Sequence, residues 1–265
     1  MLKESIVTSK LENLSIDISK DSDISIVFDS NVILFFNIQE IKQLNLNVEV
    51  LENVSARIIF WSETDSDMDI KEYYKVNKDS YINLVYGELA SGDITRHMEC
   101  DLYQGSELLV DGASITNSRK SQTFIANHLQ PYTTSNLNNY GIVSEGGKYF
   151  LDVVGSIVKG SVGSKAHQDS RILTISEKQS ATVLPQLLID ENDVEASHAA
   201  TVGQIDENHL YYMQSRGLSE MESMALLMSG YLMPIARAIS DKDLSKHIED
   251  LIISKVSEIC LVEKK

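Results

Sequence analysis

Residues 195–216 read EASHAATVGQIDENHLYYMQSR, and the character of the chain changes across them. His198 stands in a run of small side chains, so its neighbours in sequence do not crowd the imidazole. Asp206 suits the N-cap of a helix, and apolar side chains then follow at helical spacing until Gly217 ends the helix. The stretch therefore predicts an uncrowded histidine shortly before an amphipathic helix.

Upstream of this stretch, residues 24–189 form a succession of short β-like runs. They are rich in Ile, Val, Leu, Tyr and Phe, and Gly, Asn, Asp or Ser separates them. A spacing of roughly 8–12 residues fits a sandwich, a barrel or a parallel β-helix, and periodicity does not separate these folds. No repeat of fixed period is readable. The expected strands are Ile24–Phe28, Val32–Phe36, Val48–Leu51, Ala56–Trp61, Tyr81–Tyr86, Ser106–Asp111, Thr123–Ala126, Tyr149–Val154, Arg171–Ser176 and Ala181–Ile189.

Downstream of the histidine, the sequence predicts a small helical part. Ser219 and Glu222 have the spacing of a capping box at a helix start. Methionine and alanine then recur at three- and four-residue intervals, as one buried helix face requires. Gly230 and Pro234 are expected to interrupt this helix, and residues 236–239 and 244–262 give further helical pattern.

The composition argues against membrane and nucleic-acid partners. The chain has 265 residues, 43% of them hydrophobic, and no apolar run approaches the roughly 20 residues needed to cross a bilayer. Residues 1–10 lack the apolar segment of a signal peptide. The net charge of −16 disfavours nucleic acid, whose binding needs Lys and Arg on the phosphates. We therefore expect a cytoplasmic protein.

Residue patterns that usually carry catalysis are missing from the sequence. It contains no G-x-S-x-G or H-E-x-x-H motif, so no enzyme is predicted. Cys100 and Cys260 lie far apart and in no CxxC spacing, which favours buried structural thiols. Neutral imidazole is a good ligand for iron, and Glu195 is close enough in sequence to His198 to be considered as the carboxylate that orients the ring.

The stretch around His198 resembles the signature of the SufB/SufD family, the scaffold subunits of iron–sulfur cluster assembly. Family members carry a His followed by Ala-Thr, a Gly-Gln-type turn, an Ile-Asp-Glu-type helix start and a finish like L-F-Y-L-x-S-R-G. The matching positions here are 198, 200–201, 203–204, 205–207, 210–213 and 215–217. Two upstream segments extend the resemblance, GSIVKGSVGSKAHQDSRILTIS at 155–176 and EKQSATVLPQLLIDENDV at 177–194.

The resemblance implies a mainly β fold, with a right-handed parallel β-helix core followed by a small C-terminal helical part. The expected divisions are an N-terminal lead-in at 1–23, the β-helix core at 24–194, and the histidine segment with the helical part at 195–265.

Two departures from the family pattern point to its SufD-like branch. SufB-type members place a cysteine a few residues before the proline of the second segment, where this chain has Gln179 or Ser180. SufB-type members also follow the histidine with Glu, where this chain has Ala199. Iron–sulfur chemistry favours thiolate ligands, so a chain without a cysteine near His198 needs a partner that supplies one.

The resemblance also implies how the subunit works. A transient iron–sulfur cluster would form at a subunit interface around His198, with Glu195 nearby, and the chain would hold no tightly bound cofactor of its own. The partner would be a SufB-like subunit or a second copy, and a SufC-like ABC ATPase would bind the helical part. The docking positions implied are Tyr211, Tyr212, Arg216, Gly217, Leu226 and Leu227. Two alternatives are a β-helix enzyme acting on carbohydrate and a stand-alone homodimeric cluster scaffold.

Overall fold

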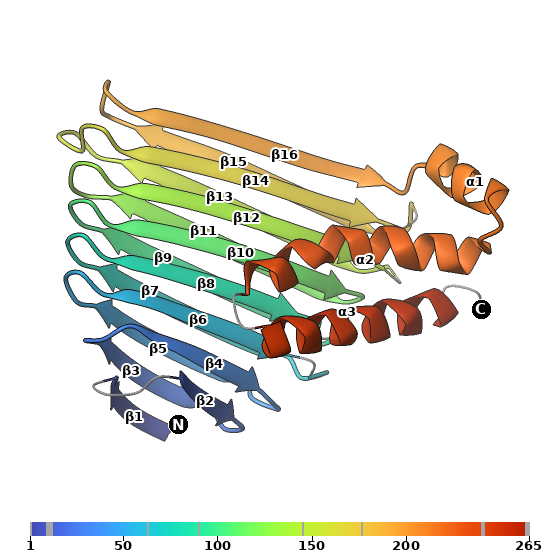
Figure 1. Ribbon diagram of the computed structural model, residues 1–265, viewed down its shortest axis with the longest axis horizontal. Helices are drawn as coiled ribbons and strands as arrows, with labels where there is room; N and C mark the ends of the chain where they lie inside the picture. Colours follow the sequence, from blue (N-terminus) through green and yellow to red (C-terminus); the bar gives the residue numbers. More distant parts are fainter. Residues whose placement is uncertain are drawn as a thin grey trace.

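The computed structural model describes residues 2–8, 13–62, 64–89, 91–144, 146–175, 177–239 and 242–262. Its body is a flattened solenoid of two eight-stranded parallel sheets, and successive strands alternate between the two (Figure 1). This arrangement confirms the prediction of a mainly β, parallel β-helix fold with a small helical part.

The odd-numbered strands build one sheet and the even-numbered strands build the other. The first sheet contains β1 (Leu2–Val7), β3 (Ser22–Phe28), β5 (Gln43–Val50), β7 (Met68–Val76), β9 (Ile94–Leu102), β11 (Arg119–His128), β13 (Lys148–Ile157) and β15 (Ser180–Ile189). The second contains β2 (Asn13–Ile18), β4 (Val32–Ile38), β6 (Ser55–Ser62), β8 (Tyr81–Glu88), β10 (Glu107–Thr116), β12 (Thr134–Val143), β14 (Lys165–Thr174) and β16 (Glu195–Gln204).

The length of one solenoid turn grows along the chain, which explains why the sequence shows no fixed repeat. Leu2 lies opposite Ser22, 20 residues later, whereas Met68 lies opposite Ile94, 26 residues later. Near the end, Lys148 lies opposite Ser180, 32 residues later. Strands lengthen in parallel, from six residues in β1 to ten in β15.

The corners that lead into the even strands share a left-handed backbone residue. Asn53, Asp79, Gly105, Tyr132 and Gly163 all have positive φ. The N–H of each donates to a carbonyl of the next turn, at 2.7–3.2 Å. Stacked corners of this kind allow turns of different length to keep one register.

Strand pairing extends beyond the expected limits of the core. β1 and β2 lie within the predicted lead-in, and β16 carries the second sheet to Gln204. The sequence also did not predict β7, β9 or β12 as strands, because many of their side chains are polar. Inward positions of β12, for example, include Ser135 and Asn139.

Three helices follow the β-helix: α1 (Glu207–Ser215), α2 (Glu220–Ala238) and α3 (Lys242–Val262). The predicted caps are confirmed, since the side chain of Asp206 accepts from the N–H of Asn208 and Ser219 forms a reciprocal capping box with Glu222. No described helix has both the length and the apolar character needed to cross a bilayer.

The expected interruption at Gly230 and Pro234 was wrong, because α2 continues through both residues. A proline inside a helix costs about 3 kcal/mol through its missing N–H and the clash of its ring. Met228, Leu232 and Ile235 are fully buried between the sheet and α3, and each buried apolar side chain contributes roughly 1.5–3 kcal/mol. Packing therefore outweighs the proline.

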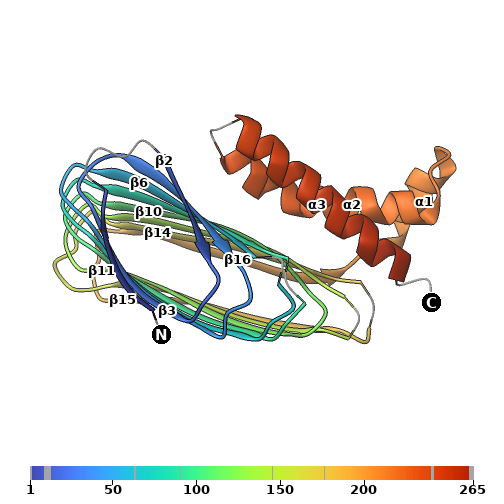
Figure 2. The same ribbon diagram turned by 90° about the horizontal axis from the view of Figure 1, so that it is seen from below.

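The helices cover only one face of the solenoid. α2 packs on β8, β10 and β12, and α3 packs on α2, whereas the outer face of the odd-strand sheet carries no helix (Figure 2). The chain thus has two apolar cores. One fills the interior between the sheets, and the other lies between the even-strand sheet and the helices around Trp61 and Leu232.

The interior also holds a cluster of four buried charges. Arg96 is ion-paired with Glu72 and with Glu88, the latter at 2.6 Å, and Lys120 lies 3.4 Å from Glu88. All four side chains are at most 1% exposed. Burial raises the pKa of Glu72, while Arg96 and Lys120 more than offset burial at Glu88 and hold the pKa of that carboxyl below its usual value. Two cations thus neutralise two carboxylates.

A buried histidine lies at the end of β11. His128 is 0% exposed, and its ring nitrogens are bonded to the hydroxyls of Thr133 at 2.7 Å and Ser135 at 2.8 Å. Burial lowers the pKa of His128 to about 4, against an ordinary value of 6.5. The ring is therefore neutral in the folded protein at physiological pH.

Replacing Arg96 by methionine should reduce the free energy of unfolding by about 3–5 kcal/mol, because two buried carboxylates would lose their common cation. Urea unfolding at neutral pH measures this loss. The matched control is Lys75→Met, which breaks a 2.8 Å pair with Glu49 at the surface and should cost less than about 1 kcal/mol. Equal losses in the two variants would contradict the stabilising role of the interior cluster.

The His128 pKa also predicts a pH dependence of stability. As pH falls below 6.5, the unfolded chain binds a proton at His128 before the folded chain does, so stability is full above 6.5 and declines toward pH 4. Between about pH 7 and pH 5 this residue should contribute a loss of about 2 kcal/mol. Urea unfolding of the wild type and His128→Gln at both pH values isolates the contribution. Identical slopes in the two proteins would refute it.

Candidate functional site

The solenoid ends in an open strand that contains the predicted histidine. β16 is the last strand of its sheet and is hydrogen-bonded to β14 alone among the described strands. All ten of its residues are exposed except Gly203, which is half-buried. One edge of β16 therefore presents unpaired backbone N–H and C=O groups, which favour addition of another strand.

His198 faces the inside of the solenoid at this open end. It pairs in register with Gln168 on β14, and residues paired in register share one face of a sheet. On β14, Ile172 belongs to the interior core, whereas Leu173 belongs to the core under the helices. Gln168 and His198 therefore lie on the inward face, with nothing stacked beyond His198 among the described strands.

The structure does not bring Glu195 to the imidazole. Residues three apart on a strand point to opposite faces, so Glu195 faces outward. Its carboxylate lies 3.0 Å from the ammonium of Lys165 on the neighbouring strand. Gln168 is instead the polar side chain beside His198. Sequence reasoning assigned it no role, although it lies in the A-H-Q run that the resemblance includes.

Neither cysteine lies at the open end. Cys100 is 0% exposed on β9, and burial raises the pKa of its thiol well above the usual value. Cys260 is buried on α3, with its sulfur 3.9 Å from that of Met228. Ser180, where SufB-type members approach their cysteine, begins β15. Within the described ranges, no three His, Cys, Asp or Glu side chains are grouped to hold a metal ion.

The expected ATPase-docking residues gather on α1 and the first half of α2. Tyr211 is 75% exposed, Tyr212 and Leu226 are each 58% exposed, and α1 has no buried residue. The guanidinium of Arg216 lies 5.3 Å from the centre of the Tyr212 ring. Gly217 has a φ of +98°, so it supplies the left-handed residue that ends α1. Leu227 is half-buried.

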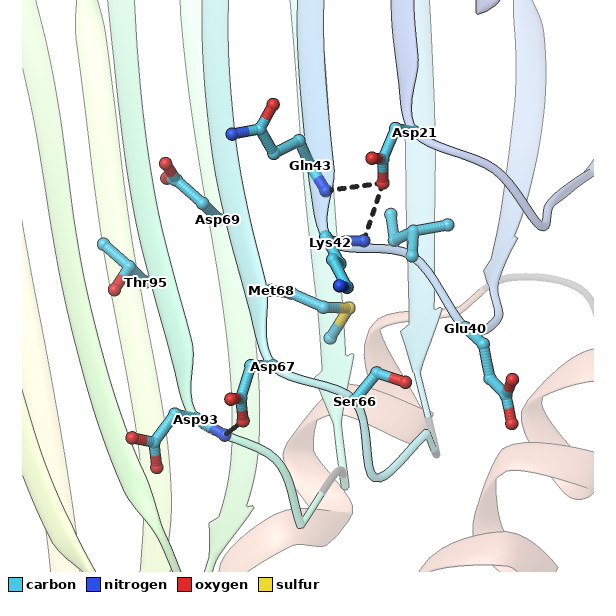
Figure 3. A pocket seen from close by; sticks show the side chains of 11 residues that line it. Asp21, Glu40, Lys42, Gln43, Ser66, Asp67, Met68, Asp69, Asp93 and Thr95 are labelled. Atoms are coloured by element: carbon cyan, nitrogen blue, oxygen red, sulfur yellow. Dashed lines mark hydrogen bonds between the residues drawn. The ribbon is translucent and has the colours of Figure 1, made fainter. Parts of the chain in front are cut away.

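A surface pocket of about 940 Å³ lies far along the solenoid, at the corners that lead into β5, β7 and β9 (Figure 3). Its carboxylates serve the backbone. Asp21 accepts from the N–H groups of Lys42 and Gln43, which lower its pKa, and Asp67 accepts from the N–H of Asp93 at 2.9 Å. These aspartates cap successive turns, so the pocket gives no support to a carbohydrate-cleaving pair of carboxylates.

Comparison with known proteins places this geometry in a family. The model of the SufBD core domain of SUF-system FeS cluster assembly matches residues 4–231, which cover the β-helix, His198 and the start of the helical part. The chain belongs to the SufBD family. The SufD-like resemblance drawn from the sequence is likewise supported by the relatives below.

The relatives of this SufBD-family chain include both branches. SufD of Bacillus subtilis is 28% identical over 221 residues, which are 80% of this chain and 50% of the relative. SufD of Escherichia coli is 23% identical over 121 residues, 46% of this chain and 29% of the relative. SufB of Bacillus subtilis is 25% identical over 112 residues, 42% and 24% respectively. The chain thus spans half or less of the length of these relatives.

Because His198 and Glu195 are exposed, changing them should leave the fold intact. His198→Ala and Glu195→Gln should each shift the free energy of unfolding by no more than about 0.5 kcal/mol in urea titrations. Any loss of iron–sulfur chemistry in His198→Ala could then be assigned to the imidazole. A loss of stability comparable to that of Arg96→Met would contradict the open-end geometry.

Proposed function

We propose that this chain is a non-catalytic, cytoplasmic scaffold subunit of a SufBCD-type iron–sulfur assembly complex. One observation carries the proposal: His198 lies on the inward face of an uncovered terminal strand, and both cysteines of the same chain are buried elsewhere. Cluster iron is held chiefly by thiolates, with histidine as an occasional ligand. His198 would thus supply part of a site that another chain completes.

The open end is suited to receive that chain. β15 and β16 are ten residues long and form the last strands of their sheets. Exposed apolar side chains at this end include Leu184, Leu188 and Val202, at 42%, 56% and 46%. Backbone pairing along both edges, together with burial of these side chains, would join a SufB-like subunit. A transient cluster would then form between His198 and the partner's thiolate.

The ATPase would bind the exposed helical surface formed by Tyr211, Tyr212, Arg216, Gly217, Leu226 and Leu227. Aromatic and Arg side chains are enriched in protein interfaces, and Tyr211 and Leu226 are too exposed to be explained by local packing. α1 connects directly to β16 through residues 205–206. Movement of the bound ATPase could therefore be transmitted to the strand that carries His198.

A stand-alone homodimeric scaffold is the second candidate. The same open end could pair with a second copy, which would bring two His198 side chains together but no exposed thiolate. This candidate therefore predicts a weaker, histidine-ligated site. The structure offers less for a carbohydrate-active enzyme, because the carboxylates of the corner pocket cap backbone N–H groups.

Anaerobic co-purification from native extract tests the proposal. The tagged chain should retain an ABC-type ATPase and a cysteine-bearing relative, both identifiable by mass spectrometry. Leu226→Asp should lose the ATPase and keep the relative, because a charge would be buried at the docking surface. The control is Tyr132→Ser, which changes an exposed aromatic residue at a distant corner. Recovery of neither partner by the wild type would overturn the proposal.

Reconstitution of the isolated chain with iron and sulfide separates the two candidates. The partner-dependent function predicts no stable cluster absorbance on the isolated chain. A stable cluster on a dimer of this chain, lost in His198→Ala, would instead establish the homodimeric scaffold.

A further inference from the structure

Gln168 lies directly beside His198 and is held in a defined orientation. Its side chain is 4% exposed, and its Nε2 donates to the backbone carbonyl of Gln186 at 3.0 Å. Gln168 is on β14 and Gln186 is on β15, so the side chain crosses the interior between the two sheets. Gly155 leaves room for it, because a Cβ at that position would lie 3.3 Å from Nε2.

This anchoring determines which atom of the amide remains available. A backbone carbonyl can only accept a hydrogen bond, so the amide nitrogen must face Gln186 and the oxygen must face away from it. Oε1 of Gln168 is buried and has no hydrogen-bond partner among the described residues. A buried acceptor without a partner is rare in folded proteins and calls for a donor.

The surroundings of Gln168 are polar on the same inward face. Ser170 Oγ and Asn139 Nδ2 are also buried without a partner in the described part of the chain, and Ser170 pairs in register with Asn139. On the opposite side, toward the open end, the inward neighbour of Gln168 is His198. No hydrogen bond to a described residue holds the imidazole, so the ring can rotate toward Oε1.

We propose that Gln168 is the positioning residue for His198: its Oε1 accepts the N–H of the imidazole and thereby fixes the tautomer and the plane of the ring. Neighbouring strands are about 4.8 Å apart, which brings an inward imidazole within reach of an inward carboxamide. Histidines that bind metal ions usually donate their other ring N–H to a carbonyl or carboxylate. Gln168 supplies that carbonyl, whereas Glu195 points to the opposite face.

The consequence is a directed lone pair. A neutral imidazole has one N–H and one nitrogen with a lone pair, so holding the N–H inward turns the lone pair outward. The lone pair then faces the open end, where a partner's thiolate and iron would meet it. This part of the inference rests on the proposed function, whereas the hydrogen bond itself does not.

Nitrogen-15 NMR of the histidine rings in the intact chain tests the hydrogen bond. At about pH 8.5 the ring is neutral, and the two ring nitrogens report the tautomer. The wild type should show a single dominant tautomer for His198, identified by loss of its signals in His198→Ala. Gln168→Met should give the mixture of tautomers typical of a free imidazole, and Ser170→Ala, two residues away on the same face, should match the wild type. A mixture in the wild type would overturn the proposal without reference to any variant.

Cluster assembly in the co-purified complex then separates this inference from the proposed function. Gln168→Met should reduce assembled iron–sulfur absorbance by about 10-fold, while Ser170→Ala leaves it unchanged. If His198→Ala has no effect on assembly, the proposed function fails, and the tautomer measurement still decides the role of Gln168. If His198→Ala abolishes assembly and Gln168→Met does not change it, the positioning role is refuted while the proposed function stands.

Discussion

In-register parallel pairing is the constraint on which the rest of this structure depends. Each strand from β3 onward lies on the strand of the preceding turn, residue against residue, so side chains at matching positions stack in rows. One such row joins Leu137, Gln168 and His198. The orientation of the histidine is thus inherited from the turn below it, and the same rule separates it from Glu195.

The stacking rule also explains how the interior tolerates charge. Phe36, Phe60 and Tyr86 stack at centroid distances of 5.4 and 5.1 Å, and the guanidinium of Arg96 lies 4.4 Å from the Tyr86 ring. Tyr86 in turn donates to Glu72 at 2.6 Å. An aromatic row on one sheet thereby supports an ionic row on the other, and the turns cannot slip relative to one another without separating these partners.

Much of this fold could be predicted from residues, but only where alternation was strong. Val32–Phe36 was predicted because its apolar side chains are dense, and it forms most of β4. β16 was not predicted, since small residues give neither a strand nor a helix signal, and without that strand the opposite facing of Glu195 and His198 could not be recognised. Gln168 required knowledge of a 30-residue register, in a chain whose turn length varies from 20 to 32. Local pattern does not contain that number.

The lengthening of the turns has a consequence for self-association. A six-residue strand such as β1 presents about 20 Å of edge, whereas the ten residues of β15 present about 33 Å. If the narrow end of one molecule met the wide end of another, a large part of the wide edge would keep bare amides and carbonyls. Head-to-tail stacking, which would otherwise propagate into fibres, is therefore penalised at every junction. The taper favours closed pairs of equal ends over open chains.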